Sequence, residues 1–204
     1  MRRYLAVIGV CCICLSGANL FAQKVDVTFG GGSLFASGTE FNGAFLPSEG
    51  GSTYLAASAD VLLRHNLGVQ GEVYWRVNQG LYGSQIPFRP VFWNFNAMYL
   101  RRFNKLLAFE GVAGVGVETL RFYSGNLSCD VSGNCTNFIS NNHFMGAAGG
   151  GLRLYFYHRL FIRPEVRVYM IPNNTGNSTT LGFSSNFPLR YGASLGYAFG
   201  ASKY

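Results

Sequence analysis

The sequence predicts an all-β fold, an eight-stranded antiparallel up-and-down transmembrane β-barrel preceded by a cleavable signal peptide. Three observations lead to this prediction. Apolar and polar residues alternate with period two along most of the chain. Charged residues make up only 12% of the sequence, whereas aromatic residues make up 16%. An apolar run near the N-terminus is too short to cross a bilayer as a helix. A closed barrel with lipid outside and a polar lumen satisfies every backbone group under this pattern.

The first 22 residues are typical of a signal peptide. Arg2 and Arg3 form its basic start, an apolar run of 12 residues follows over 4–15, and Ala22 ends a cleavage site. An uncleaved N-terminal anchor is the alternative. We expect the signal peptide to cover 1–22 and one outer-membrane barrel domain to cover 23–204.

Eight segments show the alternation, and each is long enough for a tilted membrane-crossing strand of about 9–11 residues. They are 23–35, 53–64, 67–78, 89–101, 106–120, 144–157, 160–170 and 190–199. The third segment is the cleanest. Its apolar face carries Val69, Val73 and Trp75 and no charge, whereas its polar face carries Glu72 and Arg76. One face of such a strand suits lipid, and the other suits a polar lumen.

The other seven segments repeat these two faces, with small, polar or charged residues opposite the apolar set. In chain order, their apolar faces present Val25, Val27 and Phe29; Leu55, Val61 and Leu63; Val91, Trp93 and Phe95; Phe109, Val115 and Val117; Phe144, Leu152 and Phe156; Ile162, Val166 and Met170; and Leu195, Tyr197 and Phe199. Pro164 predicts a local bulge or a late start of its strand, because proline removes a ladder hydrogen bond.

The connections alternate in length along the chain. Short turns are expected near 64–66, 101–105 and 157–159. Long polar connections, rich in Gly, Asn, Ser and Thr, are expected at 36–52, 79–88, 121–142 and 171–186. Short turns on one side and long loops on the other are typical of outer-membrane barrels, whose turns are periplasmic and whose loops are extracellular.

Ten charged residues share the polar faces, so the pattern places them in the lumen. They are Asp60, Glu72, Arg76, Glu110, Glu118, Arg153, Arg163, Glu165, Arg167 and Arg190. Five are acidic and five are basic. The interior of an eight-stranded barrel is only wide enough for side chains, and an unpaired buried charge is costly. We therefore expect a salt-bridge network that plugs the barrel. The alternative is a narrow ion path through it.

Two cysteines remain after removal of the signal peptide, Cys129 and Cys135, in a polar loop of an exported chain. This context predicts a disulfide. A metal pair is the alternative, but the loop holds no His and no third Cys. We expect no metal site, no cofactor and, in the absence of a basic run, no nucleic-acid partner.

The chain resembles the small eight-stranded outer-membrane proteins of the OmpA-like transmembrane-barrel superfamily, as a pattern over the whole mature chain. The C-terminal insertion signal of that family carries the resemblance, and it is matched by Arg190, Gly192, Leu195 and Tyr197, with Phe199 continuing the series. The resemblance implies an outer-membrane location, extracellular loops and periplasmic termini. It also implies contact with outer-membrane lipid and lipopolysaccharide, and insertion by the barrel-assembly machinery. The tail over 200–204 departs from members that end on the aromatic residue.

A catalytic role is not expected. The lipid A deacylases share this barrel and carry a His and a Ser two residues apart on one strand. Here the position two residues after His143 is Met145, and leucines follow His65 and His158 at the same spacing. The Gly-rich stretches 111–116 and 146–151 keep strand alternation and precede no helix, so they do not predict a phosphate loop.

The sequence thus predicts a non-enzymatic integral outer-membrane protein with a structural or surface-interaction role through its extracellular loops and a plugged lumen. It does not name the loop partner. A narrow ion or small-solute channel, porin-like in function, is the first alternative. A secreted soluble ligand-binding barrel is the second, and it would need its apolar face turned inward.

Overall fold

The computed structural model describes residues 24–36, 40–41, 44–45, 48–64, 66–82, 86–129, 133, 135–172 and 186–199. The predicted signal peptide, the C-terminal tail and most of the expected 171–186 connection lie outside these residues. Among the described residues, no helix is long and apolar enough to cross a membrane.

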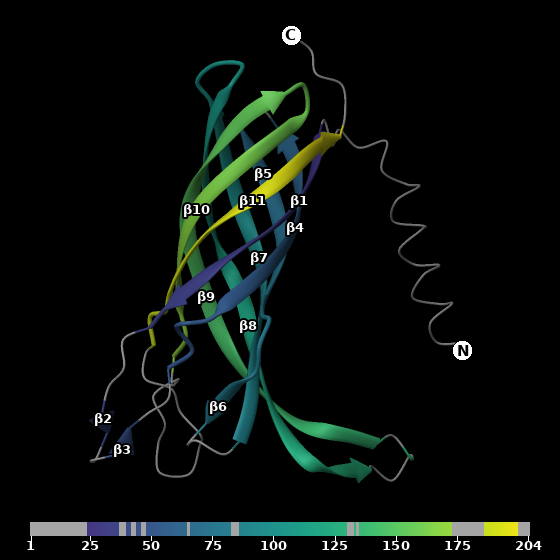
Figure 1. The fold of residues 1–204 in the computed structure, drawn as a ribbon. Coiled ribbons are helices and arrows are strands. Elements are labelled where there is room, and N and C mark those ends of the chain that lie inside the picture. Colours follow the sequence, from purple (N-terminus) through teal and green to yellow (C-terminus); the bar gives the residue numbers. More distant parts are fainter. Residues whose placement is uncertain are drawn as a thin grey trace.

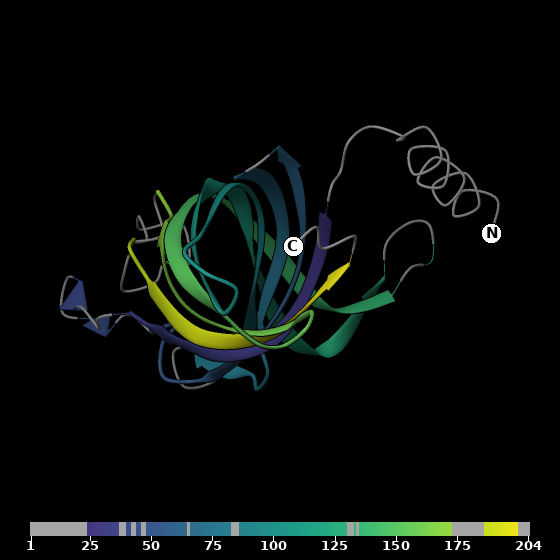
Figure 2. The same ribbon diagram turned by 90° about the horizontal axis from the view of Figure 1, so that it is seen from above.

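Eight strands form a closed antiparallel barrel in which each strand pairs with its neighbours along the chain and the first pairs with the last (Figures 1 and 2). They are β1 (Lys24–Phe35), β4 (Thr53–Arg64), β5 (Leu67–Arg76), β7 (Ile86–Arg102), β8 (Leu107–Cys129), β9 (Cys135–Tyr157), β10 (Leu160–Met170) and β11 (Leu189–Phe199). The predicted up-and-down barrel of eight strands is confirmed.

Three short strands lie outside this ring. The strand β6 (Gly80–Tyr82) pairs with the start of β7, and β2 (Glu40–Phe41) pairs with β3 (Ala44–Phe45). All three belong to connections that were expected to be long and polar.

The expected long loop over 121–142 is wrong in its extent, because most of it is strand. The strand β8 runs on to Cys129 and β9 begins at Cys135, so the two form a hairpin that projects beyond the barrel (Figure 1). Tyr123 and Phe138 are paired across this hairpin with ring centroids 5.9 Å apart. Cross-strand aromatic pairs stabilise antiparallel ladders, which explains why the strands continue past the barrel.

The two ends of the barrel differ. At one end, here the turn end, β1 begins and β11 ends, with Val25 paired to Phe199. The short turns β4–β5, β7–β8 and β9–β10 lie there too. The opposite end, here the loop end, carries β2, β3, β6 and the β8–β9 hairpin (Figure 1).

The outer wall carries a wide uncharged band. On β7 the outward positions between Arg101 and Arg89 are held by Tyr99, Ala97, Phe95, Trp93 and Val91. All of them except the buried Val91 are exposed, and the exposed fraction of Phe95 is 63%. At about 3.3 Å per residue, the span from Arg101 to Arg89 is roughly 40 Å along the strand. A strand tilt of about 40° reduces it to roughly 30 Å along the barrel axis.

Pro164 leaves the register intact. The β10–β9 ladder runs from the pair Ile162–Leu154 to the pair Glu165–Gly151 without a shift, and no pair lies between them. Pro164 still opposes Ala193 on β11. The bulge or late start expected at the proline is therefore wrong, because losing one N–H removes ladder pairs without adding a residue. The irregularity of this ladder lies between Leu160 and Phe161.

Candidate functional site

The lumen is the candidate functional site, because the polar face of every barrel strand converges there. Strand parity turns all ten sequence-predicted charges inward. Nine of them are buried, and Arg76 is half-buried. They separate into two ion-pair clusters and two residues that join neither cluster.

The first cluster, here the turn-side cluster, consists of Asp26, Asp60, Glu110, Arg153 and Arg163. Arg153 on β9 is its centre. Its Nε lies 2.6 Å from Glu110 Oε2, its Nη2 lies 2.7 Å from Asp60 Oδ2, and its Nη1 pairs with Asp26. Arg163 on β10 reaches Asp60 at 3.2 Å and Glu110 at 3.1 Å. Two guanidinium groups thus hold three carboxylates from three different strands.

Neutral side chains complete the turn-side cluster. Gln70 Nε2 donates to Asp60 Oδ1 at 2.8 Å, and Asn96 Nδ2 donates to Gln70 Oε1 at 3.2 Å. Arg163 also donates to the hydroxyl groups of Thr28 at 3.1 Å and Ser194 at 3.2 Å. Buried charges need their remaining donors and acceptors satisfied. These groups supply most of the further hydrogen bonds, whereas Asp26 Oδ1 and Asn96 Oδ1 have no hydrogen-bond partner among the described residues.

The second cluster, here the loop-side cluster, consists of Glu72, Glu165, Arg167 and Arg190. Arg167 Nη2 lies 3.0 Å from Glu72 Oε2 and 2.9 Å from Glu165 Oε2, and Arg190 pairs with both carboxylates. Arg190 also lies over the ring of Tyr74, 4.0 Å from its centroid. The two clusters meet where Arg163 Nε lies 3.3 Å from Glu165 Oε2.

Two apolar layers enclose the ion pairs. The turn-side layer contains Leu62, Met98, Leu100, Ala108, Val112, Tyr155, Phe161 and Ala198. The loop-side layer contains Leu34, Tyr54, Ala56, Tyr74, Phe92, Met145, Ala147, Tyr169 and Ile171. Aromatic stacking strengthens the second layer, with Tyr54 on Tyr74 at 4.8 Å and Phe92 on Tyr169 at 5.1 Å between ring centroids. An ion crossing the lumen would have to pass both layers and separate the ion pairs.

The network differs in two members from the set that the alternation predicts. Asp26 is fully buried in the turn-side cluster and is absent from that set, although it shares a period-two face with Lys24 and Thr28. Lys24 Nζ lies 3.9 Å from Asp26 and supplies a fifth cation at the rim. The enclosed charges therefore still balance, five against five, but with these two residues as members.

Glu118 and Arg76 lie closer to the loop end and form no ion pair with another described residue. The carboxyl group of Glu118 is fully buried and faces that of Glu49, from the connection before β4. Arg76 lies over the ring of Phe88, 5.3 Å from its centroid. Both residues have the inward parity of the network, but they lie beside the loop-side layer, directly opposite its members Phe92 and Tyr54 on the ladders.

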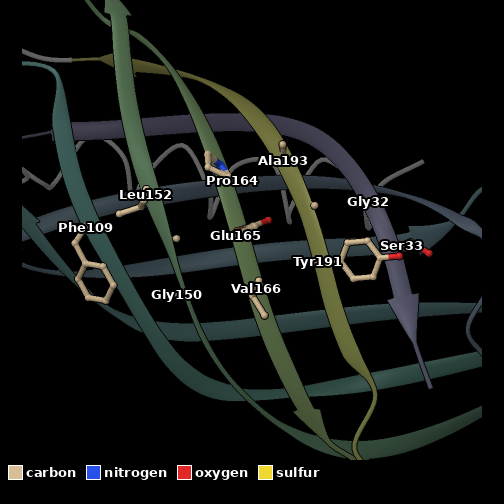
Figure 3. A pocket seen from close by; sticks show the side chains of 12 residues that line it. Gly32, Ser33, Phe109, Gly150, Leu152, Pro164, Glu165, Val166, Tyr191 and Ala193 are labelled. Atoms are coloured by element: carbon tan, nitrogen blue, oxygen red, sulfur yellow. The ribbon is translucent and has the colours of Figure 1, made fainter. Parts of the chain in front are cut away.

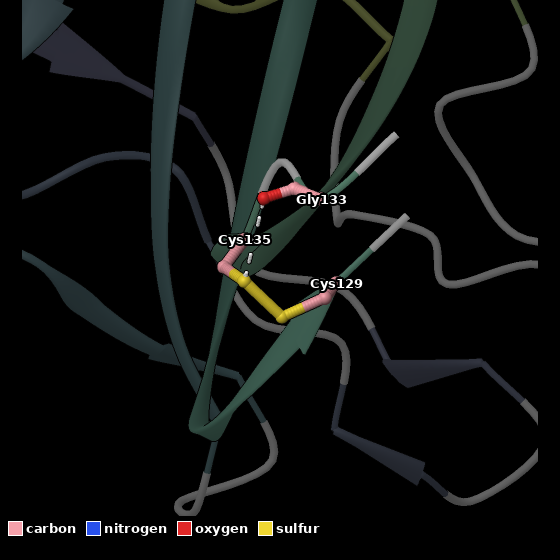
Figure 4. Close-up of a disulfide and its surroundings, with 3 residues drawn as sticks. All are labelled: Cys129, Gly133 and Cys135. Atoms are coloured by element: carbon pink, nitrogen blue, oxygen red, sulfur yellow. Dashed lines mark hydrogen bonds between the residues drawn. A yellow bond between two sulfur atoms is a disulfide. The ribbon is translucent and has the colours of Figure 1, made fainter. Parts of the chain in front are cut away.

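The predicted disulfide is confirmed. Cys129 and Cys135 are joined at the tip of the β8–β9 hairpin, where both residues are exposed (Figure 4). The bond closes the short connection between the two strands well away from the barrel wall.

The outer wall carries a shallow apolar groove of about 790 Å³ across β8 to β11 and β1 (Figure 3). Small outward residues such as Gly150 and Ala193 form its floor between the larger Phe109, Leu152 and Tyr191. Glu165 contributes only its stem, because its carboxylate belongs to the loop-side cluster. The groove therefore offers mainly carbon surface.

The candidate metal ligands, the described histidines and the residues of the C-terminal signal lie in separate parts of the barrel. Among the described residues, no group of three His, Cys, Asp or Glu could hold a metal ion. His143 opposes Glu118 across the β8–β9 ladder, and His158 lies in the β9–β10 turn. His65 lies outside the described residues. In the C-terminal signal, Arg190 and Gly192 turn inward, whereas Leu195, Tyr197 and Phe199 are exposed on the outer wall.

Solved structures with this architecture are small outer-membrane barrels. Neisserial surface protein A has a TM-score of 0.57 at 12% identity, over 86% of this chain and 96% of that one. Ail, the attachment invasion locus protein of Yersinia pestis, in complex with the heparin analogue sucrose octasulfate, has a TM-score of 0.53 at 14% identity, over 86% and 98%. OprG from Pseudomonas aeruginosa has a TM-score of 0.51 at 15% identity, over 88% and 97%.

No protein-family model matches the chain, and no curated protein matches it in sequence. The resemblance to outer-membrane barrels therefore rests on the shared fold: a closed ring of eight antiparallel strands.

Proposed function

We propose that this chain is an integral outer-membrane protein that acts at the cell surface through its loop end and whose lumen does not conduct ions. One observation carries the proposal: the lumen is filled by a balanced ion-pair network enclosed between two apolar layers. A lumen filled in this way leaves the loop end as the part of the molecule that meets other molecules.

The outer wall supports the membrane location. Its uncharged band of roughly 30 Å suits the hydrocarbon core of a bilayer, which is about 30 Å thick. Large apolar side chains stand exposed on it, among them Phe29, Trp93 and Phe144. A secreted soluble barrel would carry the opposite arrangement, with its charged face outward. The fold shared with outer-membrane barrels points to the same location.

The proposal includes extracellular loops, periplasmic termini, export by the signal peptide over 1–22 and insertion by the barrel-assembly machinery through the C-terminal signal. It assigns contacts with outer-membrane lipid and lipopolysaccharide to the outer wall. It includes no catalytic role, because the carboxylates of the two ion-pair clusters are all paired with arginines.

Migration of the membrane fraction on a denaturing gel, with and without boiling, tests the closed barrel. We expect the unboiled protein to run faster and to resist carbonate extraction. Protein that shows no shift and appears in the soluble fraction would contradict the membrane location.

Thiol labelling of intact cells tests the orientation. After mild reduction, a membrane-impermeant maleimide should label Cys129 and Cys135, which lie at the tip of the loop-end hairpin. The variant with both cysteines replaced by serine is the matched control. Labelling only after cell disruption would place the loop end in the periplasm.

Conductance in planar bilayers separates the plugged barrel from the channel alternative. We expect no discrete conductance steps from the folded protein, and none from the Arg76→Gln variant. Steps in the unaltered protein whose size changes in Arg76→Gln or Arg167→Gln would support the channel instead.

A further inference from the structure

Two arginines face each other on the outer wall, where the uncharged band ends towards the loop end. Arg89 on β7 and Arg121 on β8 are direct partners across the ladder. Both point outward, because the buried Phe88, Leu120 and Phe122 hold the inward positions beside them. Opposed side chains have Cβ atoms about 5 Å apart, and like charges at such positions destabilise the strand pair.

The described residues provide neither arginine with a carboxylate partner. Arg89 Nη2 donates to the backbone oxygen of Val77 at 3.0 Å, and the guanidinium lies 6.0 Å from the centroid of Tyr123. The Arg121 guanidinium lies 5.1 Å from the centroid of Phe138. The Nε atom of each arginine is buried and has no acceptor among the described residues. Within the described part of the chain, the positive charge of both arginines is therefore not neutralised.

Polar side chains on the same face complete the surroundings of the pair. Ser140 on β9 is the direct ladder partner of Arg121, and Thr119 opposes Asn142 one outward step closer to the band. Ser140 and Asn142 are exposed, and Thr119 is half-buried. Hydroxyl and amide groups beside two guanidinium groups suit a ligand that carries both a phosphate and sugar hydroxyls.

The position of the arginine pair along the barrel axis corresponds to the level of lipid head groups. Arg101, the outward charge at the turn end of β7, lies roughly 30 Å from Arg89 along the barrel axis, as derived from the strand rise and tilt. The two arginines therefore stand at opposite faces of the hydrocarbon layer. Trp93 lies on the same outward face of β7, four residues from Arg89 and nearer the bilayer centre, and tryptophan is enriched at such interfaces.

We propose that Arg89 and Arg121 form a binding site for a phosphate group of an outer-leaflet glycolipid. The inference rests on the proposed function for the orientation of the barrel. Guanidinium groups bind phosphate through paired, charge-assisted hydrogen bonds, and arginine matches phosphate geometry better than lysine does. One phosphate between the two side chains removes their mutual repulsion. Thr119, Ser140 and Asn142 then face the sugar.

The test is binding of lipid A to the full-length mature protein, refolded in detergent, followed by the fluorescence of the outward Trp93 and Trp75. The variants are Arg89→Gln/Arg121→Gln and, as a matched control from the other rim, Arg101→Gln. The parallel ligands are dephosphorylated lipid A, phosphatidylglycerol and inorganic phosphate. Each sample is first checked for heat-modifiable migration, so that failure of the barrel is recognised separately from failure of the site.

We expect the unaltered protein and Arg101→Gln to bind lipid A equally. We expect the double variant to bind it at least tenfold more weakly, and loss of the phosphates from the lipid to have the same effect. Binding of lipid A by a folded double variant within twofold of the unaltered protein would overturn the site. Equal affinity for phosphatidylglycerol, or competition by inorganic phosphate at comparable concentration, would overturn the glycolipid as its occupant.

Discussion

Among the described residues, the charged side chains of the two lumen clusters are paired with opposite charges, whereas the arginines on the outer rims are not. Inside the lumen, Arg153 touches three carboxylates and has no exposed surface. On the outer rims, Arg89, Arg101 and Arg121 form no ion pair with a described residue and lie beside aromatic rings instead. Burial makes pairing obligatory because a lone buried ion costs several kcal/mol. At the rims, exposure to the surroundings removes that requirement, so the rim charges are free to meet external ligands.

The largest expected effect comes from breaking the centre of the turn-side cluster. Arg153→Met leaves Asp60 and Glu110 with Arg163 alone and Asp26 with only Lys24 at 3.9 Å, and it should destabilise the barrel by about 3–5 kcal/mol. Urea unfolding of the refolded protein in lipid vesicles, followed by loss of the fast-migrating band, measures it. A loss below about 1 kcal/mol would show that the cluster is not buried as described.

Glu165→Gln should have a smaller effect. The amide keeps the shape and one acceptor oxygen, but it loses the charge that Arg163, Arg167 and Arg190 share. We expect a loss of about 2 kcal/mol in the same unfolding assay, in line with hydrogen bonds to charged groups. Stability equal to that of the unaltered protein would mean that the loop-side cluster does not depend on this carboxylate.

Glu118→Gln compares a lumen carboxylate that joins no cluster with the carboxylates that pair with arginine. Glu118 is as buried as Glu110, but it faces Glu49 and joins no ion pair with a described residue. Replacing it should leave stability unchanged or raise it by up to about 1 kcal/mol, because burial and the neighbouring Glu49 carboxyl both disfavour the charged form that the substitution removes. Destabilisation by about 2 kcal/mol or more would indicate a cationic partner for Glu118.

Arg101→Gln should have the smallest effect. The side chain is exposed at the turn end and lies over Phe103, 5.9 Å from its centroid. Exposed surface changes usually stay within about 0.5 kcal/mol. The midpoint of urea unfolding should therefore coincide with that of the unaltered protein. A marked shift would place this rim residue among the buried, paired charges.

Period-two alternation predicted the barrel well because strand parity is a local property. The expected segments 53–64 and 160–170 coincide with β4 and β10. Strand parity also predicted that Arg153, Arg163 and Arg167 point into the lumen. It could have found Asp26, which shares the polar face of β1 with Thr28.

Height along the barrel could not be predicted in the same way. It depends on the stagger between neighbouring strands, which no single segment reveals. Glu110 and Glu118 have the same parity on β8, eight residues apart, yet only Glu110 reaches an arginine. The long β8–β9 hairpin was missed for another reason. Its polar composition resembled that of a loop, and the pairing of Tyr123 with Phe138 becomes visible only once the register is known.

The lumen charges are also ordered along the chain. Four of the five carboxylates in the two ion-pair clusters, Asp26, Asp60, Glu72 and Glu110, come from β1 to β8, whereas all four guanidinium groups of these clusters come from β9 to β11. Along the chain the acidic strands therefore precede the arginines that neutralise them. Without the last three strands, the two clusters would keep four carboxylates and a single cation, Lys24. Neutralising that interior and sealing the β1–β11 seam depend on the same three strands, which ties the electrostatics of the lumen to the closure of the barrel.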